Sequence, residues 1–205
     1  MPPPQAQSNT PRMQLGAQNL TGRFVRLEPL AEGHREGLRV AANDPAIWTY
    51  LPIRGYGPDF EVWFDAARQM QESGAHLVFC VRRLADNVLV GSTRFLEIVP
   101  AHKRAEIGWT WYARDTQAGA VNPECKLLLL GHAFEAGANR VELKTDARNA
   151  RSRAAIAKLG ARQEGLFRAH MVMSDGHIRD TAYFSVIRSE WPGVRAGLEA
   201  RLAAY

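Results

Sequence analysis

The chain has little cysteine and no long apolar run. Its 205 residues include only two cysteines, Cys80 and Cys125, and each lies in an apolar stretch. Two cysteines are too few for a metal site, and we interpret them as reduced, packed thiols. No apolar run reaches membrane-spanning length, and the N-terminus lacks the charged and apolar regions of a signal peptide. The sequence therefore predicts a cytoplasmic protein with no bound metal and no membrane partner.

The sequence also lacks internal repeats and linkers, and its charge is only mildly basic. A net charge of +5 is compatible with an acidic partner. It does not predict nucleic acid as a substrate, because scattered arginines are usually solvated. Residues 1–19 are rich in Pro, Gln, Ser and Asn and predict a disordered leader. The remainder, residues 20–205, is expected to form a single domain.

Apolar periodicity predicts an α+β fold. Helical spacing and strand alternation follow one another in a mixed order: an antiparallel meander, a strand–helix–strand crossover, a second helix, a closing hairpin and a last helix. The expected helices are 32–43, 59–73, one beginning at Asn122, 150–159 and one starting near residue 190; the expected strands are 23–27, 76–83, 88–99, 105–112, 140–145, 164–173 and 178–187. The sheet should be twisted and mostly antiparallel.

One stretch, residues 105–137, organises the rest of the chain. An apolar strand is followed by a loop of small and polar residues, and then by Asn122 and Pro123, which favour a helix N-cap and the first helical position. Gly137 is expected to end the helix. The start of a helix offers unpaired N–H groups and the positive end of its dipole, which attract an anion. We expect the loop 117–122 to hold a pyrophosphate; an ordinary strand-to-helix connection is the alternative.

These features, taken in order, resemble the GNAT acyl-CoA N-acyltransferases, and more narrowly the RimJ/RimL-like branch that contains the ribosomal-protein N-terminal acetyltransferases. The resemblance covers about residues 20–191. It is carried by the segments 22–27 (GRFVRL), 105–109 (AEIGW), 117–122 (QAGAVN), 149–152 (NARS), 158–160 (KLG), 175–176 (DG), 179–181 (RDT) and 190–191 (EW). It implies a three-layer α/β/α sandwich around a mixed sheet with a central parallel pair.

The loop departs from the family pattern, which is Gln or Arg, two residues, Gly, one residue, then Gly or Ala. With Gln117 in first place, Ala120 stands where the family has its first glycine and Asn122 stands in the last position. Ala120 then needs a negative φ to avoid strain, or else the turn moves onto Gly119.

The resemblance also implies roles for individual residues. Acetyl-CoA would be the co-substrate, and the chain would form a homodimer, as the family often does. The implied CoA-binding residues are Trp109, Thr110, Trp111, Gln117, Ala118, Gly119, Ala120, Val121, Asn122, Asn149 and Ser152. Backbone N–H groups of residues 108–112 would polarise the thioester carbonyl.

Two residues are candidates for the catalytic steps. Glu106 would act as general base, directly or through water; a surface ion pair with the neighbouring Lys103 or Arg104 is the alternative. Many relatives carry a tyrosine as general acid further along the helix that begins at 150, and this chain has none there. Ser152 is therefore the candidate that protonates or hydrogen-bonds the departing thiolate, with Tyr183 as a fallback.

Three further residues, Trp48, Tyr50 and His170, are candidates for binding the acceptor. The aromatic pair lies in a loop beside Gly and Pro, and the histidine lies on a strand that leads into an acidic hairpin. Each has a structural alternative: most tryptophans are core residues, and a lone strand histidine is more often structural. In the same way, Asn149 followed by Ser152 is a good helix cap on local grounds.

The acceptor must lose a proton before it can attack a thioester. At pH 7 this costs about 1.4 kcal/mol for an α-amine of pKa near 8 and about 4.6 kcal/mol for a lysine. A single carboxylate suits the first better, so we expect a peptide or protein N-terminus, or a small-molecule amine. Alternatives are an antibiotic or polyamine acceptor, succinyl-CoA as donor, or a CoA-binding regulatory module without turnover.

Overall fold

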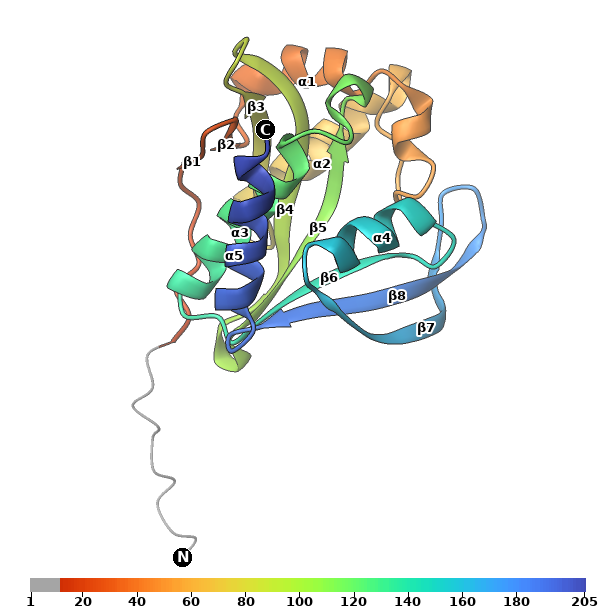
Figure 1. The fold of residues 1–205 in the computed structure, drawn as a ribbon. Helices are drawn as coiled ribbons and strands as arrows, with labels where there is room; N and C mark the ends of the chain where they lie inside the picture. The colour runs from red at the N-terminus through yellow and green to blue at the C-terminus, as the bar shows by residue number, and fades with distance from the viewer. Residues whose placement is uncertain (1–11) are drawn as a thin grey trace, which may run out of the picture.

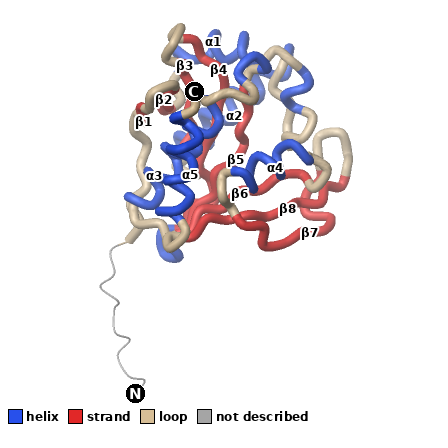
Figure 2. Tube along the Cα trace, in the orientation of Figure 1, coloured by secondary structure: helices blue, strands red, loops and turns tan. Residues whose placement is uncertain are grey.

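The computed structural model describes residues 12–205 and contains one mixed sheet of eight strands in the order β1-β2-β3-β4-β5-β6-β8-β7 (Figures 1 and 2). The predicted leader, 1–19, lies in part outside the described residues. The strands are β1 (Leu20–Thr21), β2 (Val25–Pro29), β3 (Leu77–Arg83), β4 (Val88–Val99), β5 (Arg104–Tyr112), β6 (Arg140–Asp146), β7 (Arg162–Val172) and β8 (Ile178–Ile187).

Helices cover both faces of this sheet (Figure 1). The helices are α1 (Arg35–Ala42), α2 (Phe60–Glu72), α3 (Val121–Glu135), α4 (Ala150–Lys158) and α5 (Trp191–Ala203), and the short 3₁₀ turns include η2 (Pro45–Trp48), η3 (Gly57–Asp59) and η5 (Arg114–Thr116). Helices α1 and α2 lie on one face, and α3, α4 and α5 lie on the other. The predicted α/β/α sandwich around a mixed sheet is confirmed.

The parallel pair, β5 and β6, is short. Only Arg104–Glu106 of β5 pair with Arg140–Glu142 of β6, whereas every other pairing in the sheet of residues 12–205 is antiparallel. Beyond Glu106, β5 continues to Tyr112 and β6 to Asp146 without pairing to each other. The two strands diverge visibly in Figure 1. The central parallel pair that the resemblance implies is therefore present, and its two strands separate beyond Glu106.

Each face of the sheet has its own apolar core. On one side α3 and α5 bury residues such as Leu129, Leu130 and Leu198 against the strands. On the other side Trp48 stacks edge-on against Trp63 at 5.7 Å, in a cluster that α1, α2 and η2 form over β3 and β5. Each large apolar side chain buried in this way contributes about 1.5–3 kcal/mol. The two cores fix α3 and the η2–η3 connection on opposite faces.

Several boundaries differ from those expected, among them the strand expected at 23–27, which is β2 at Val25–Pro29, and two that concern α3. Residues 12–19 pack against α3: Met13 is 3% exposed, and the Gln14 N–H donates to the Ala136 carbonyl at 2.9 Å. Ordered contact thus begins before residue 20. Helix α3 begins at Val121 with Ala120 as its N-cap, not at Asn122 and Pro123. Proline fits anywhere in a first turn, because the N–H it lacks would have no helical partner there.

Both cysteine side chains are buried as free thiols, as expected. Burial raises the pKa of Cys125 to about 12 and also raises that of Cys80. Neither thiol is therefore ionised near neutral pH. Among the described residues, no helix is both long and apolar enough to span a bilayer.

Candidate active site

The loop 117–122 leads into the first turn of α3. Ala118 adopts a left-handed φ of 67°, and Ala120 has a φ of −71°. The expectation that Ala120 takes a negative φ is confirmed, but the left-handed position falls on Ala118 and not on Gly119. Within residues 12–205, the N–H groups of residues 119–122 form no hydrogen bond. These amides lie at the positive end of the α3 dipole and can bind an anion.

Glu124, one turn into α3, fixes this helix to the start of β2. Its buried carboxylate accepts hydrogen bonds from the backbone N–H groups of Arg23, Phe24 and Val25 at 2.7, 2.6 and 2.7 Å. A Cβ on Gly22 would lie 2.6 and 2.7 Å from the two Glu124 oxygens. Glycine at position 22 is therefore required by the close approach of this carboxylate, which holds the loop end of α3 in place.

A hydrogen bond joins the 117–122 loop to the start of α4. The Arg151 guanidinium donates to the Gln117 side-chain oxygen at 2.5 Å. Asn149 is the N-cap of α4, since its side chain accepts from the Ser152 N–H at 2.9 Å. The capping alternative for Asn149 is thus observed. Within the described chain the Ser152 hydroxyl makes no hydrogen bond, and its side chain is only partly buried, so it is free to donate to a ligand.

Glu106 is the last residue of β5 that pairs with β6, and it is almost fully buried at 2% exposure. Its carboxylate lies 2.8 Å from the Lys144 ammonium on β6. The predicted alternative, a surface ion pair with Lys103 or Arg104, is wrong, because Arg104 instead pairs with Glu142. Burial raises the pKa of the Glu106 carboxyl above its usual range, although Lys144 opposes this. A buried carboxyl with a raised pKa is a stronger base than an exposed one.

Glu106 points away from α3, because side chains alternate along a strand and its neighbours Ala105 and Ile107 enter the core under α3. On the same face, the Lys144 ammonium lies over the Tyr183 ring at 5.5 Å. Polar contacts continue through the His170 imidazole, which lies 3.4 Å from the Tyr183 hydroxyl.

The other ring nitrogen of His170 lies 3.1 Å from the Thr181 hydroxyl. Burial, with Lys144 and Arg179 nearby, lowers the pKa of His170. The structure therefore brings His170 into the polar surroundings of Glu106, and the imidazole is neutral near pH 7.

The three predicted CoA-binding residues of β5 have different environments. Trp109 has a left-handed φ of 49°, at a register shift between β4 and β5. The Trp111 ring is 3% exposed and packs in the core of the α1–α2 face. Thr110 faces α3 and accepts a hydrogen bond from the buried Lys126 ammonium at 3.0 Å. Burial lowers the pKa of Lys126 to about 8. Any contact of β5 with a ligand would therefore come mainly from its backbone edge, which is unpaired beyond Glu106.

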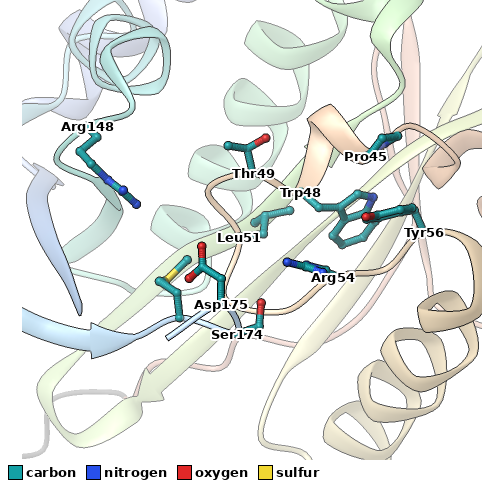
Figure 3. Close-up of a pocket in the computed structure, with 10 residues that line it drawn as sticks. Pro45, Trp48, Thr49, Leu51, Arg54, Tyr56, Arg148, Ser174 and Asp175 are labelled. Atoms are coloured by element: carbon teal, nitrogen blue, oxygen red, sulfur yellow. The ribbon is translucent and has the colours of Figure 1, made fainter. Parts of the chain in front are cut away.

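A cavity of about 270 Å³ lies between the η2–η3 connection and the hairpin between β7 and β8 (Figure 3). Trp48 lines this cavity although its ring is 3% exposed and belongs to the core. Tyr50 does not line it but lies 5.9 Å from the Arg148 guanidinium, which does. Asp175, a turn residue whose side chain accepts from the His177 N–H, also lines the cavity. Trp48 and Tyr50, both predicted to bind the acceptor, thus lie at or near one cavity. The Trp48 ring is mainly a core residue.

The sequence did not reveal three of the residues that shape this site: Glu124, Lys144 and Arg179. The signal for Lys144 was present, since Glu142, Lys144 and Asp146 alternate on β6 and share the face of Glu106. Using it required the register of the parallel pair, which places Glu106 opposite Glu142. Within residues 12–205, no group of three or more His, Cys, Asp and Glu side chains could hold a metal ion.

Comparison with known proteins identifies the family. Residues 25–162 match the family model described as "Acetyltransferase (GNAT) domain". The solved structure of a GCN5-related N-acetyltransferase from Brucella melitensis is 32% identical, with a TM-score of 0.88 over 96% of this chain and 90% of that one. RimJ from Mycobacterium smegmatis, solved in complex with CoA-disulfide, is 23% identical, with a TM-score of 0.73 over 90% and 93% of the two chains, and shares the fold.

A curated relative agrees with the narrower resemblance. The "Putative ribosomal N-acetyltransferase YdaF" of Bacillus subtilis (strain 168) is 29% identical over 111 residues, which are 54% of this chain and 60% of that protein. The family predicted from the sequence is confirmed by the model match and by the Brucella structure. The chain belongs to the GNAT family of acetyltransferases.

Proposed function

We propose that this acetyltransferase moves an acetyl group from acetyl-CoA directly to a protein N-terminal α-amine, with Glu106 as general base. The observation that carries the proposal is the position of Glu106: a buried carboxylate with a raised pKa, at the point where β5 and β6 part. An acid buried in an apolar strand destabilises the fold unless it is paired or has a function. Its ion-pair partner, Lys144, only partly offsets the burial.

The donor side of the proposal rests on the 117–122 loop. The four free N–H groups of residues 119–122 and the α3 dipole suit a pyrophosphate, and the small side chains of the loop leave the amides open. RimJ, which shares the fold, was solved with a CoA-disulfide, and this supports CoA as the ligand. Acetyl-CoA would supply the activated acyl group. Further contacts with CoA remain predictions: the side chains of Gln117 and Asn149, and the backbone edge of the strand residues Trp109–Trp111.

The proposed proton transfers use residues on both sides of the point where β5 and β6 separate. Glu106 takes a proton from the acceptor ammonium, and Lys144 beside it stabilises the carboxylate form before the reaction. The unpartnered Ser152 hydroxyl, at the first turn of α4, donates to the departing thiolate. Trp48, Tyr50 and His170 lie on the acceptor side, around and beside the hairpin cavity. The name of the Bacillus relative supports an N-terminal acceptor on a ribosomal protein.

The test is a thiol-release assay with acetyl-CoA and succinyl-CoA against a panel of peptides, polyamines and aminoglycosides. We expect release with acetyl-CoA and N-terminal peptides, and a loss of about 100-fold or more in kcat for Glu106→Gln, in keeping with general-base catalysis. Glu135→Gln, at an exposed acid on α3, is the matched control and should keep full activity. Binding of CoA without thiol release from any amine would instead indicate a regulatory module.

Two further properties belong to this proposal. The enzyme would act in the cytoplasm, where acetyl-CoA is available and where its two buried thiols stay reduced. It would also act as a homodimer. Light scattering coupled to gel filtration tests the second property, and a mass equal to the 22.8 kDa of one chain would contradict it.

A further inference from the structure

Most arginines that are buried or partly buried in this protein have an acidic partner. Arg82 binds Glu28, Arg104 binds Glu142, and Arg140 binds Glu142 and Glu164. Arg179, on β8, is an exception. Its residue is 5% exposed, and its Nε atom is fully buried without a hydrogen-bond partner. Within residues 12–205 the other two guanidinium nitrogens form no hydrogen bond or ion pair either.

The position of Arg179 is set by strand register. Asp146, the last residue of β6, pairs with Thr181, so Arg179 lies just beyond the end of β6 and on the same face as Asp146 and Lys144. The neighbouring carboxylates are already occupied. Asp146 accepts three hydrogen bonds from Arg148, at 2.8, 3.1 and 2.9 Å, and Glu106 is held by Lys144. Asp146 and Glu106 are close enough to act on the charge of Arg179 but do not bond to it.

Leaving a guanidinium nitrogen buried without a partner is costly, since its N–H group loses water and gains no hydrogen bond in return. Arg94 is also unpaired, but its guanidinium lies over the Trp109 ring at 4.8 Å and contacts His76. Arg179 has no such aromatic contact in the described structure. Only the Nε atom of Arg179 is fully buried, so its other two nitrogens remain accessible to a ligand, near enough to Glu106 and Asp146 for those charges to act on Arg179.

Space for a ligand exists at this end of the sheet. Arg179 pairs with Met171 on β7, and Met173, two residues further, lines the 270 Å³ cavity together with Arg148 and Asp175 (Figure 3). A planar guanidinium with several free N–H groups matches the two oxygens of a carboxylate.

We propose that Arg179 binds a carboxylate on the acceptor, next to the amine that is presented to Glu106. The inference rests on the proposed function and narrows its substrate class to acidic acceptors. Two sources share this chemistry: the side chain of an acidic residue at the start of a peptide, and the α-carboxylate of a free amino acid. The charge of Arg179 selects the acid, and Glu106 deprotonates the amine beside it.

The test compares acids with their amides. The full-length protein is assayed with acetyl-CoA and with peptides that begin with Asp or Glu, against the same peptides with Asn or Gln. Free amino acids and their amides form the second arm and separate the two sources. We expect the wild-type kcat/KM to favour the acid about tenfold or more in one of the two arms, because a hydrogen bond to a charged group is worth at least one factor of ten.

In Arg179→Gln this preference should fall to near unity, whatever happens to the absolute rate. Arg168→Gln, at an exposed arginine on β7 without an ion pair in the described structure, is the matched control and should keep the preference. If Arg179→Gln does not fold, Arg179→Lys keeps the charge and should retain part of the preference. Equal rates for acids and amides in the wild type, or an unchanged preference in Arg179→Gln, would overturn the assignment.

The two proposals fail in different ways. If no amine releases thiol, the proposed function is wrong, and Arg179 is then tested by calorimetry on the CoA-loaded protein. Tighter binding of the acid than of the amide, lost in Arg179→Gln, would still support a carboxylate site. Equal binding of acid and amide would exclude it.

Discussion

The hydrogen bonds of Glu124 should make the largest single polar contribution to holding the start of α3. Its carboxylate accepts from three backbone N–H groups at 2.6–2.7 Å in a buried setting. Hydrogen bonds to charged groups contribute about 1.5–3 kcal/mol each. In Glu124→Gln one oxygen is replaced by an NH₂ group that faces N–H donors, so at least one bond is lost and one donor is left without a partner. We expect the free energy of unfolding to fall by about 3–5 kcal/mol.

Urea denaturation followed by fluorescence measures this loss. Glu135→Gln changes an exposed acid on the same helix and should cost less than about 0.5 kcal/mol, as surface substitutions do. CoA affinity should fall together with stability, because the same helix end carries the free N–H groups. A loss below about 1 kcal/mol for Glu124→Gln would refute the reasoning, since it would mean that the three short bonds contribute little.

Gly22 provides an independent check of the same contact. A Cβ at this position would lie 2.6 and 2.7 Å from the Glu124 oxygens, so Gly22→Ala should destabilise the wild type. In a Glu124→Ala background the obstructing carboxylate is gone, and Gly22→Ala should cost little. The double-mutant cycle should therefore show a coupling energy of about 1 kcal/mol or more, whereas additive effects would contradict a direct steric contact.

Three further predictions concern buried charges and backbone strain. Arg94→Met should raise the free energy of unfolding by about 1 kcal/mol or more, because two guanidinium nitrogens are buried without partners. By NMR titration the same change should raise the pKa of His76 from about 4, where burial and the Arg94 charge hold it. Hydrogen bonds from Arg82 lower the pKa of the Glu28 carboxyl to about 2 from 4.5. The contribution of this carboxylate to the free energy of unfolding is therefore fully present above pH 4.5 and is lost as the pH falls toward 2. The wild type and Glu28→Gln should differ in stability above pH 4.5, and that difference should vanish toward pH 2. Ala118→Gly should stabilise the fold by about 1 kcal/mol in thermal unfolding, since alanine is strained at a φ of 67°.

Elements governed by local signals could be predicted from the sequence. The bounds expected for β4 and β8, 88–99 and 178–187, agree with the structure. Both strands begin just after a turn whose residues, Asp-Asn or Asp-Gly, favour a hairpin. The start of α3 was wrong by a few residues because Asn122 and Pro123 are good local capping residues. There the position of the helix end depends on Glu124 bonding to β2 and on the left-handed Ala118, which are tertiary features.

In the candidate site, too, residues with a local sequence signal could be predicted, and residues that depend on tertiary contacts could not. Glu106 could be singled out because an acid inside an apolar strand is unusual, and the 117–122 loop because a strand, small residues and a helix follow one another. The ion-pair partner of Glu106 could not be predicted, because Lys144 lies on another strand and approaches Glu106 only through the register of the parallel pair. Arg179 was visible only as part of a motif. That it is buried and unpartnered depends on Arg148 occupying Asp146, which no local pattern encodes.

The chemistry of this fold depends on where strand pairing stops. Pairing between β5 and β6 ends at Glu106, which is 2% exposed, so a buried carboxylate lies at the point where the two strands separate. The free N–H groups of the 117–122 loop lie on the α3 side, and Lys144, Arg179 and His170 lie on the opposite face. A thioester held from the first side and an amine held from the second can meet only through the gap between the strands. The register shift at Trp109, with its left-handed φ of 49°, lies within the unpaired part of β5. In the proposed reaction, Glu106 acts from the end of the paired segment, between these two sides.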